Sequence, residues 1–174
     1  MTIQVKKATA RLLALSLVLF VSCGATAAPP QSAKHADRII IEKSKRTLTL
    51  MNGATILKTY KVALGGQPVG AKQRLGDHRT PEGLYIVDQK KPVSQFYRAL
   101  HISYPNARDR ENARNLGVSP GGDVEIHGLG TKFGWIGAAH LQMDWTDGCI
   151  AVTNEEIDEI YPLVAVGTPV EIKP

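Results

Sequence analysis

Short runs of β-branched and apolar residues, broken by glycine and proline, are the feature that most constrains the fold of this chain of 174 residues. Runs of this kind are typical of β-strands. Residues 38–42 and 47–51 flank Ser44 and Lys45 and predict a hairpin. Further strands are predicted at six ranges: 56–64, 84–88, 99–103, 123–126, 149–152 and 168–172.

Helical patterns occupy little of the chain. Residues 108–116 form a short candidate that stops at Gly117, and residues 154–161 form a clearer one. Thr153 and Glu156 have the spacing of a capping box at the start of the second helix. Residues 65–83 are rich in glycine and proline and predict a long structured loop. Many short strands with one or two short helices predict a mainly β fold, a sandwich or a barrel.

The first 27 residues have the pattern of a secretory signal peptide. Lys6, Lys7 and Arg11 precede an apolar run at 12–21, and Ala25-Thr26-Ala27 matches the cleavage pattern. The apolar run is too short to span a membrane. We therefore expect a signal peptide at 1–27, a flexible leader at 28–37 and one domain at 38–174. The predicted location is secreted, periplasmic or associated with the cell wall.

The charge of the chain argues against nucleic-acid binding. Removing the three basic residues of the first segment from the 21 lysines and arginines leaves 18, against 16 acidic residues, a net charge of +2. A nucleic-acid-binding protein needs a clustered basic face, which so small an excess does not supply.

Cysteine usage points to a single thiol. Cys23 lies in the signal segment, where Phe20 replaces the leucine usual in a lipoprotein anchoring motif, so lipid attachment is not expected. Cys149 then has no partner for an internal disulfide in an oxidising compartment. Such a thiol is either buried and inert or reactive, and the count alone leaves both open.

Residues 125–154 carry the candidate chemistry. His127 ends one predicted strand, and Cys149 begins another after Gly148. An imidazole beside the thiol could take its proton and later protonate a leaving amine. Gly148 would let the backbone bend so that N–H groups face one point, as an oxyanion hole requires. A Cys–His pair from two neighbouring strands is the predicted site.

Zinc chemistry is the alternative that the same region leaves open. His127, His140, Asp144 and Cys149 are possible ligand types. The intervals of 13 residues between the histidines and 9 from His140 to Cys149 fit no compact zinc motif. We therefore expect neither metal nor cofactor.

The segments His127-Gly128 and Thr146-x-Gly148-Cys149-Ile150 resemble the signature of the L,D-transpeptidase catalytic domain (the YkuD type). The Thr80-Pro81-Glu82-Gly83 element and residues 102–106 are also similar to that family, and the resemblance covers residues 38–173. It implies a β-sandwich of short mixed strands in an enzyme that remodels peptidoglycan. The cysteine attacks a stem-peptide carbonyl, expels the terminal D-alanine and forms a thioester, which an amine of a neighbouring stem resolves into a cross-link.

The resemblance also implies roles for single residues. Cys149 would be the nucleophile and His127 the general base and acid. The carbonyl of Gly128 would orient the imidazole, and the N–H groups of Gly148 and Cys149 would form the oxyanion hole. Four further residues are expected to contact substrate, with ordinary packing as the alternative for each: His140, Trp145, Thr146 and Tyr104.

Three features depart from the family pattern. Many members have Arg or Asn where this chain has Ala151, and another residue in place of Asp147. An acid beside the thiolate would disfavour its ionisation, so Asp147 is expected to point outward. The interval 129–145 is also longer than expected.

Stem peptides of peptidoglycan are the expected partners, and carbapenems the expected covalent inhibitors. Hydrolysis of the same thioester, as in an L,D-carboxypeptidase or an amidase, is the nearest alternative. A non-catalytic wall-binding module is the alternative of another class.

Overall fold

The computed structural model describes residues 1–2 and 35–174. The chain divides into two units, Met1–Gln31 and Ser32–Pro174, and the fold below is that of the second unit from His35 onward. Apart from Met1 and Thr2, the predicted signal peptide lies outside the described residues and remains a prediction. Among the helices that the structure describes, none is long and apolar enough to cross a membrane.

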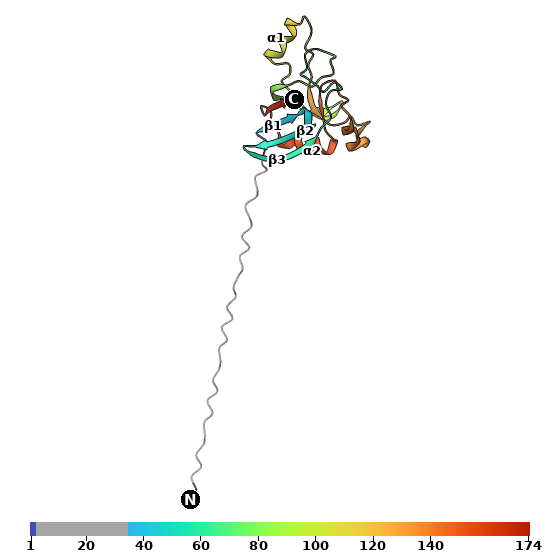
Figure 1. Ribbon diagram of the computed structural model, residues 1–174. Helices are drawn as coiled ribbons and strands as arrows, with labels where there is room; N and C mark the ends of the chain where they lie inside the picture. The colour runs from blue at the N-terminus through green and yellow to red at the C-terminus, as the bar shows by residue number, and fades with distance from the viewer. Residues whose placement is uncertain (3–34) are drawn as a thin grey trace. The chain divides into compact units, whose positions relative to one another are not determined.

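From His35 onward, eight strands form one mixed sheet in the order β3-β2-β1-β8-β4-β5-β6-β7. Figure 1 labels the first three strands along the chain, β1, β2 and β3. The pairs β1·β8 and β6·β7 are parallel, and the other neighbouring pairs are antiparallel. The predicted mainly β fold with mixed strands is confirmed, as is the hairpin at its start. The strands are β1 Arg38–Glu42, β2 Thr47–Asn52, β3 Thr55–Lys61, β4 Gly83–Ser94, β5 Tyr97–Ile102, β6 Glu125–His127, β7 Ile150–Ala151 and β8 Pro169–Lys173.

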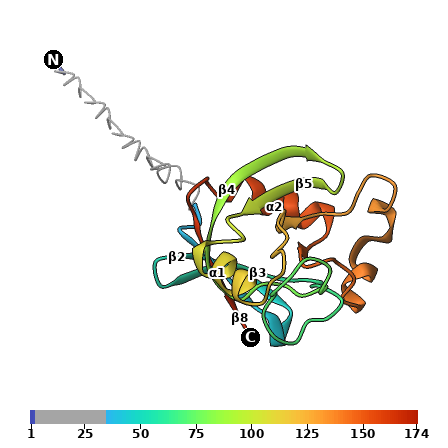
Figure 2. The same cartoon turned by 90° about the horizontal axis from the view of Figure 1, so that it is seen from above.

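Strand β4 joins the two halves of the sheet and is longer than the predicted run 84–88. Its first residues, from Gly83 to Ile86, pair with β8, and its later residues, from Val87 onward, pair with β5. Register shifts interrupt the second pairing, and irregularities of this kind let a strand bend. Figure 2 shows β4 and β5 arching alongside each other. The strand therefore carries the sheet around the core.

The two ends of the sheet meet beyond β3 and at β7. Ala63 and Ala151 exchange two backbone hydrogen bonds, Ala63 N to Ala151 O at 2.9 Å and Ala151 N to Ala63 O at 2.8 Å. The predicted strand 56–64 thus ends early as a regular strand, at Lys61, but its last residues still pair. This contact places the segment after β3 against the strand that follows Cys149.

The core is built from alternate residues of the strands and one face of a helix. Ile39 and Ile41 of β1 are fully buried while their neighbours are not, the period of two that a sheet imposes. Helix α2, Asn154–Leu163, buries Ile157 and Ile160. The other helical elements are α1 Ala107–Asn115 and the 3-10 segments η1 Lys43–Lys45 and η2 Gly134–Gln142.

The predicted loop at 65–83 is fixed by a buried lysine from η1. Lys43 is 2% exposed, and its Nζ donates to Gly70 O at 2.7 Å, Thr80 O at 3.1 Å and Glu82 Oε1 at 2.7 Å. These acceptors match the three donors of an ammonium group. The loop is therefore an ordered part of the fold, as its composition predicts.

The capping box at Thr153 and Glu156 is confirmed. Thr153 Oγ1 accepts from Glu156 N at 3.2 Å, and Glu156 Oε2 accepts from Thr153 N at 2.9 Å. Thr153→Ala removes the acceptor and should lower the free energy of unfolding by about 1 kcal/mol. Urea denaturation measures the change, and Thr153→Ser, which keeps the hydroxyl, should stay close to wild type. Equal losses in the two variants would contradict the role of the cap.

Candidate active site

His127 ends β6 in a fixed orientation. The residue is 1% exposed, and its Nδ1 lies 2.6 Å from the carbonyl oxygen of Gly128. A carbonyl only accepts, so Nδ1 carries the proton and Nε2 has a free lone pair. This is the hydrogen bond that the family resemblance implies for Gly128.

Cys149 follows a tight turn whose backbone is fixed by hydrogen bonds to the Thr146 side chain. Thr146 Oγ1 donates to Cys149 O at 2.7 Å and accepts from Gly148 N at 3.1 Å. Gly148 has φ 129°, and a Cβ there would lie 2.6 Å from the carbonyl oxygen of Arg79. Only glycine suits this position. Because Thr146 engages the Gly148 N–H, the N–H of Cys149 is the candidate oxyanion donor at the nucleophile itself.

Parallel pairing of β6 with β7 brings the two side chains to one cavity. His127 lies opposite Ala151, two residues beyond Cys149. His127 and Cys149 both line a cavity of about 590 Å³. In the described part of the chain, Sγ makes its hydrogen bond to Asp123 O, at 3.5 Å, and none joins it to His127. Hydrogen bonds between catalytic groups often form fully only with substrate bound.

Two aromatic rings enclose the imidazole. Phe96, in the turn between β4 and β5, stacks on His127 with ring centroids 4.4 Å apart and planes 23° apart. Trp145 meets His127 edge-on at 6.1 Å. The rings fix the tilt of the imidazole and exclude water from its face. Phe96 has no motif that could have marked it in the sequence.

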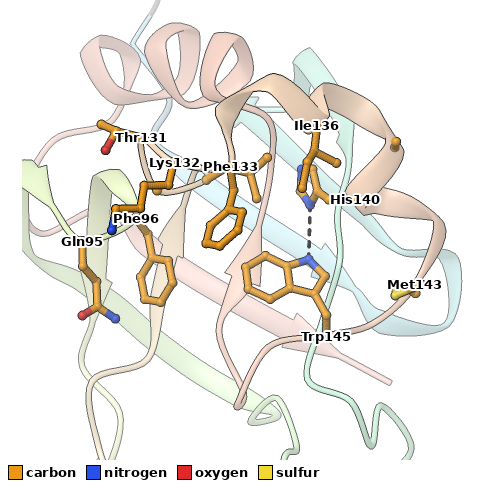
Figure 3. A pocket seen from close by; sticks show the side chains of 12 residues that line it. Gln95, Phe96, Thr131, Lys132, Phe133, Ile136, His140, Met143 and Trp145 are labelled. Atoms are coloured by element: carbon orange, nitrogen blue, oxygen red, sulfur yellow. Dashed lines mark hydrogen bonds between the residues drawn. The ribbon is translucent and has the colours of Figure 1, made fainter.

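Trp145 is held in turn by His140. Trp145 Nε1 donates to His140 Nδ1 at 3.2 Å, drawn as a dashed line in Figure 3. His140 is 7% exposed and lines a second, mostly apolar cavity of about 620 Å³, which shares Phe96 and Trp145 with the cavity of Cys149. His140 thus packs against Trp145 and does not line the cavity of Cys149.

Burial sets the charge state of the pair. Desolvation lowers the pKa of His127, against the opposing effects of the Gly128 carbonyl and the negative charge of Glu125. Desolvation raises the pKa of Cys149 to about 11, and the charges of Glu125 and Asp147 act in the same direction. Both directions favour the neutral forms. The resting pair is therefore best described as a thiol beside a neutral imidazole, which fits a base that takes the thiol proton during attack.

The other predicted residues have mixed outcomes. Asp147 points outward as expected, with its side chain 88% exposed and 2.7 Å from His78 Nδ1. Thr146 lines the cavity, but its hydroxyl group is hydrogen-bonded to the backbone of the turn. Tyr104 is 3% exposed in the core and donates to Pro120 O at 2.9 Å, so the expected substrate contact is wrong.

Asp144, one of the four residues named for a zinc site, is engaged in other contacts. Asp144 accepts from Arg46 at 2.8 Å and from Leu64 N at 2.9 Å. Within residues 1–2 and 35–174, no three His, Cys, Asp or Glu side chains gather as metal ligands. The zinc alternative therefore has no ligand set in the described part of the chain.

The chain matches the family model of YkuD, the L,D-transpeptidase catalytic domain, over residues 36–172. The chain belongs to this family, as its motifs predict. It is 36% identical over 132 residues to "Putative L,D-transpeptidase YafK" of Escherichia coli strain K12, a match that covers 72% of this chain and 46% of YafK. The chain thus spans about half the length of the curated relatives it matches.

Solved structures share the fold at lower identity. The helical cell shape determining protein Pgp2 of Campylobacter jejuni is 23% identical with a TM-score of 0.60, over 83% of this chain and 52% of that one. LD transpeptidase LdtMt1 in complex with imipenem is 17% identical with a TM-score of 0.50, over 77% of this chain and 57% of that one. At these identities the likeness is one of fold.

Gly148→Ala tests the turn before the thiol. A methyl group at φ 129° would meet Arg79 O, so the free energy of unfolding should fall by more than about 1 kcal/mol. Thermal and urea denaturation measure the loss. Gly66→Ala is the matched control, because its Cβ would make only an ordinary contact, 3.8 Å from Asp144 O. A Gly148→Ala protein as stable as this control would contradict the account of the turn.

The raised pKa of Cys149 predicts an unusual pH profile. An exposed thiol approaches full ionisation above its ordinary pKa of about 8.5. With the pKa of Cys149 at about 11, the rate of alkylation by iodoacetamide should still be rising at about pH 10. Mass spectrometry of the free protein follows the reaction, with glutathione as the reference thiol. A plateau near that of glutathione would contradict the burial argument.

Proposed function

We propose that this protein is an exported L,D-transpeptidase that acylates Cys149 with a peptidoglycan stem peptide and transfers the acyl group to an amine. The proposal is carried by one observation: Gly128 O fixes Nδ1–H of His127, and Cys149 lines the same cavity. This leaves Nε2 as a base at the cavity that contains the nucleophile. Family membership supports the reaction class.

The acylation step follows from the neutral resting pair. His127 Nε2 takes the thiol proton as Sγ bonds to the carbonyl carbon of the stem, and the carbonyl electron pair moves to oxygen. The Cys149 N–H stabilises that oxyanion. When the intermediate collapses, the C–N bond breaks, and the imidazolium gives its proton to the departing D-alanine nitrogen. The product is a thioester.

The deacylation step runs in the opposite sense. An amine from a second stem attacks the thioester, His127 takes a proton from that amine, and Sγ leaves and is protonated again. A new amide then links the two stems. Water at the same position would release a shortened stem, which is the hydrolase alternative.

The role of Trp145 is proposed on position. It lines the Cys149 cavity and contacts His127 at the same time. Its ring can therefore pack against the bound stem while keeping the imidazole in place. His140 is proposed to act on substrate only through Trp145.

Carbapenem labelling tests the nucleophile and its base. The β-lactam carbonyl should acylate Sγ and open the ring, so the intact mass rises by one whole inhibitor. Cys149→Ser should remove the adduct, and His127→Ala should slow its formation at least about 10²-fold while circular dichroism stays unchanged. The solved relative in complex with imipenem supports the choice of probe. An unlabelled wild-type protein would contradict the proposal.

Product analysis with disaccharide tetrapeptides separates the alternatives. Cross-links between the third residues of two stems support transfer. Tripeptides without cross-links support hydrolysis. A wild-type protein that leaves the tetrapeptide unchanged supports a wall-binding module.

A further inference from the structure

Lys72 is a buried cation that the reaction above does not use. It lies in the loop at 65–83, is 7% exposed and donates to Asp77 Oδ1 at 2.9 Å. An ammonium group has three donors. Among the described residues no second acceptor bonds to it, whereas Lys43, which fixes the same loop, has all three donors engaged. A buried charge with free donors is costly, so its position calls for a reason.

Lys72 lies beside the turn that precedes the thiol. Its Nζ lies 3.5 Å from the point that a Cβ on Gly148 would occupy, directly over the turn before the nucleophile. Lys72 and Cys149 line one small cavity of about 200 Å³. Phe96 and His127 line the cavity of about 590 Å³ and do not line this small one.

Asp77, the partner of Lys72, also accepts hydrogen bonds from the backbone. Asp77 accepts backbone N–H bonds from Gln73 at 2.7 Å, Arg74 at 3.1 Å and Arg79 at 3.1 Å. Burial alone would raise the pKa of Asp77, but these donors and Lys72 together bring it down to about 2. These backbone donors balance part of the carboxylate charge of Asp77, and the charge of Lys72 acts to lower the pKa of Cys149.

We propose that Lys72, held by Asp77 beside the Gly148–Cys149 turn, stabilises the negative charge that forms at Cys149 during acylation. The charge is first on sulfur as the proton leaves and then on the carbonyl oxygen as the S–C bond forms. Because the Gly148 N–H is engaged by Thr146, it is not free to bind the oxyanion, and the ammonium adds the positive potential that this donor would have supplied. The reaction part of this inference rests on the proposed function.

Other charged groups around Cys149 also affect the ionisation of its thiol. Glu125 and Asp147 oppose ionisation of the thiol, and Lys72 favours it. Glu125 is paired with Lys91 at 2.6 Å, and Asp147 with His78 at 2.7 Å. Asp123 accepts a hydrogen bond from Sγ through its backbone carbonyl, and its carboxylate lies 3.7 Å from His101. His127 lines the larger cavity together with Cys149. Lys72 is the lysine that lines the small cavity together with Cys149, whereas Lys91 lines the larger one and is paired with Glu125.

The test is the pH dependence of Cys149 alkylation by iodoacetamide in the full chain. Lys72→Gln removes the charge but keeps a donor for Asp77, and Lys72→Met removes both. Each should move the profile to higher pH by about one unit, which is about tenfold slower alkylation below the pKa. Lys72→Arg should restore the wild-type profile. Carbapenem acylation should likewise be slower in Lys72→Gln and Lys72→Met, and restored in Lys72→Arg.

Lys43→Met is the matched control, because Lys43 fixes the same loop but does not line either cavity of Cys149. It should lower the melting temperature without moving the profile. The inference is overturned if Lys72→Gln alkylates like wild type, if Lys72→Arg is as slow as Lys72→Gln, or if Lys43→Met shifts the profile as much. Should Lys72→Met fail to fold, Lys72→Gln decides.

The readout separates this inference from the proposed function. Alkylation needs no peptidoglycan, so a shifted profile in a protein that processes no stem peptide supports Lys72 and contradicts the transpeptidase. An unshifted profile in an active enzyme contradicts Lys72 alone.

Discussion

The backbone of Ala151 is the point on which the candidate site depends. It pairs with Ala63 through two hydrogen bonds, and the next residue, Val152, donates to the carbonyl of His127 at 2.9 Å. One short strand thereby fixes the histidine strand on one side and the segment after β3 on the other. Ala151 is fully buried between them. The arginine or asparagine of many family members would need other surroundings here, so the departure matches the packing of this chain.

Burial gives the site its chemical character. Desolvation lowers the pKa of His127 and raises the pKa of Cys149, so both groups favour their neutral forms. The neutral form of Cys149 is less open to oxidation and disulfide exchange, which act on the thiolate. It also requires that the charge created by attack be stabilised locally. The Cys149 N–H and Lys72 are the groups beside the turn that meet this requirement.

Sequence reasoning predicted what local patterns encode. The hairpin, the capping box and the outward Asp147 follow from turn, cap and charge chemistry within a few residues. The Cys–His pair could be named because its residues stand in motifs. Phe96 and Lys72 could not, because their contacts with His127 and Gly148 form only when β4 bends and the loop at 65–83 folds back. Tyr104 was misjudged because an aromatic residue beside a motif has the same sequence whether it faces a cleft or the core.

The interval 129–145 explains why the imidazole is so tightly enclosed. It contains η2, which places His140 against Trp145 and lines the apolar cavity beyond it. Phe96 and Trp145 form the wall between that cavity and the one that contains Cys149. Because the same two rings touch His127, the wall and the base cannot move independently. The shape of the apolar cavity and the orientation of His127 are therefore coupled through Phe96 and Trp145.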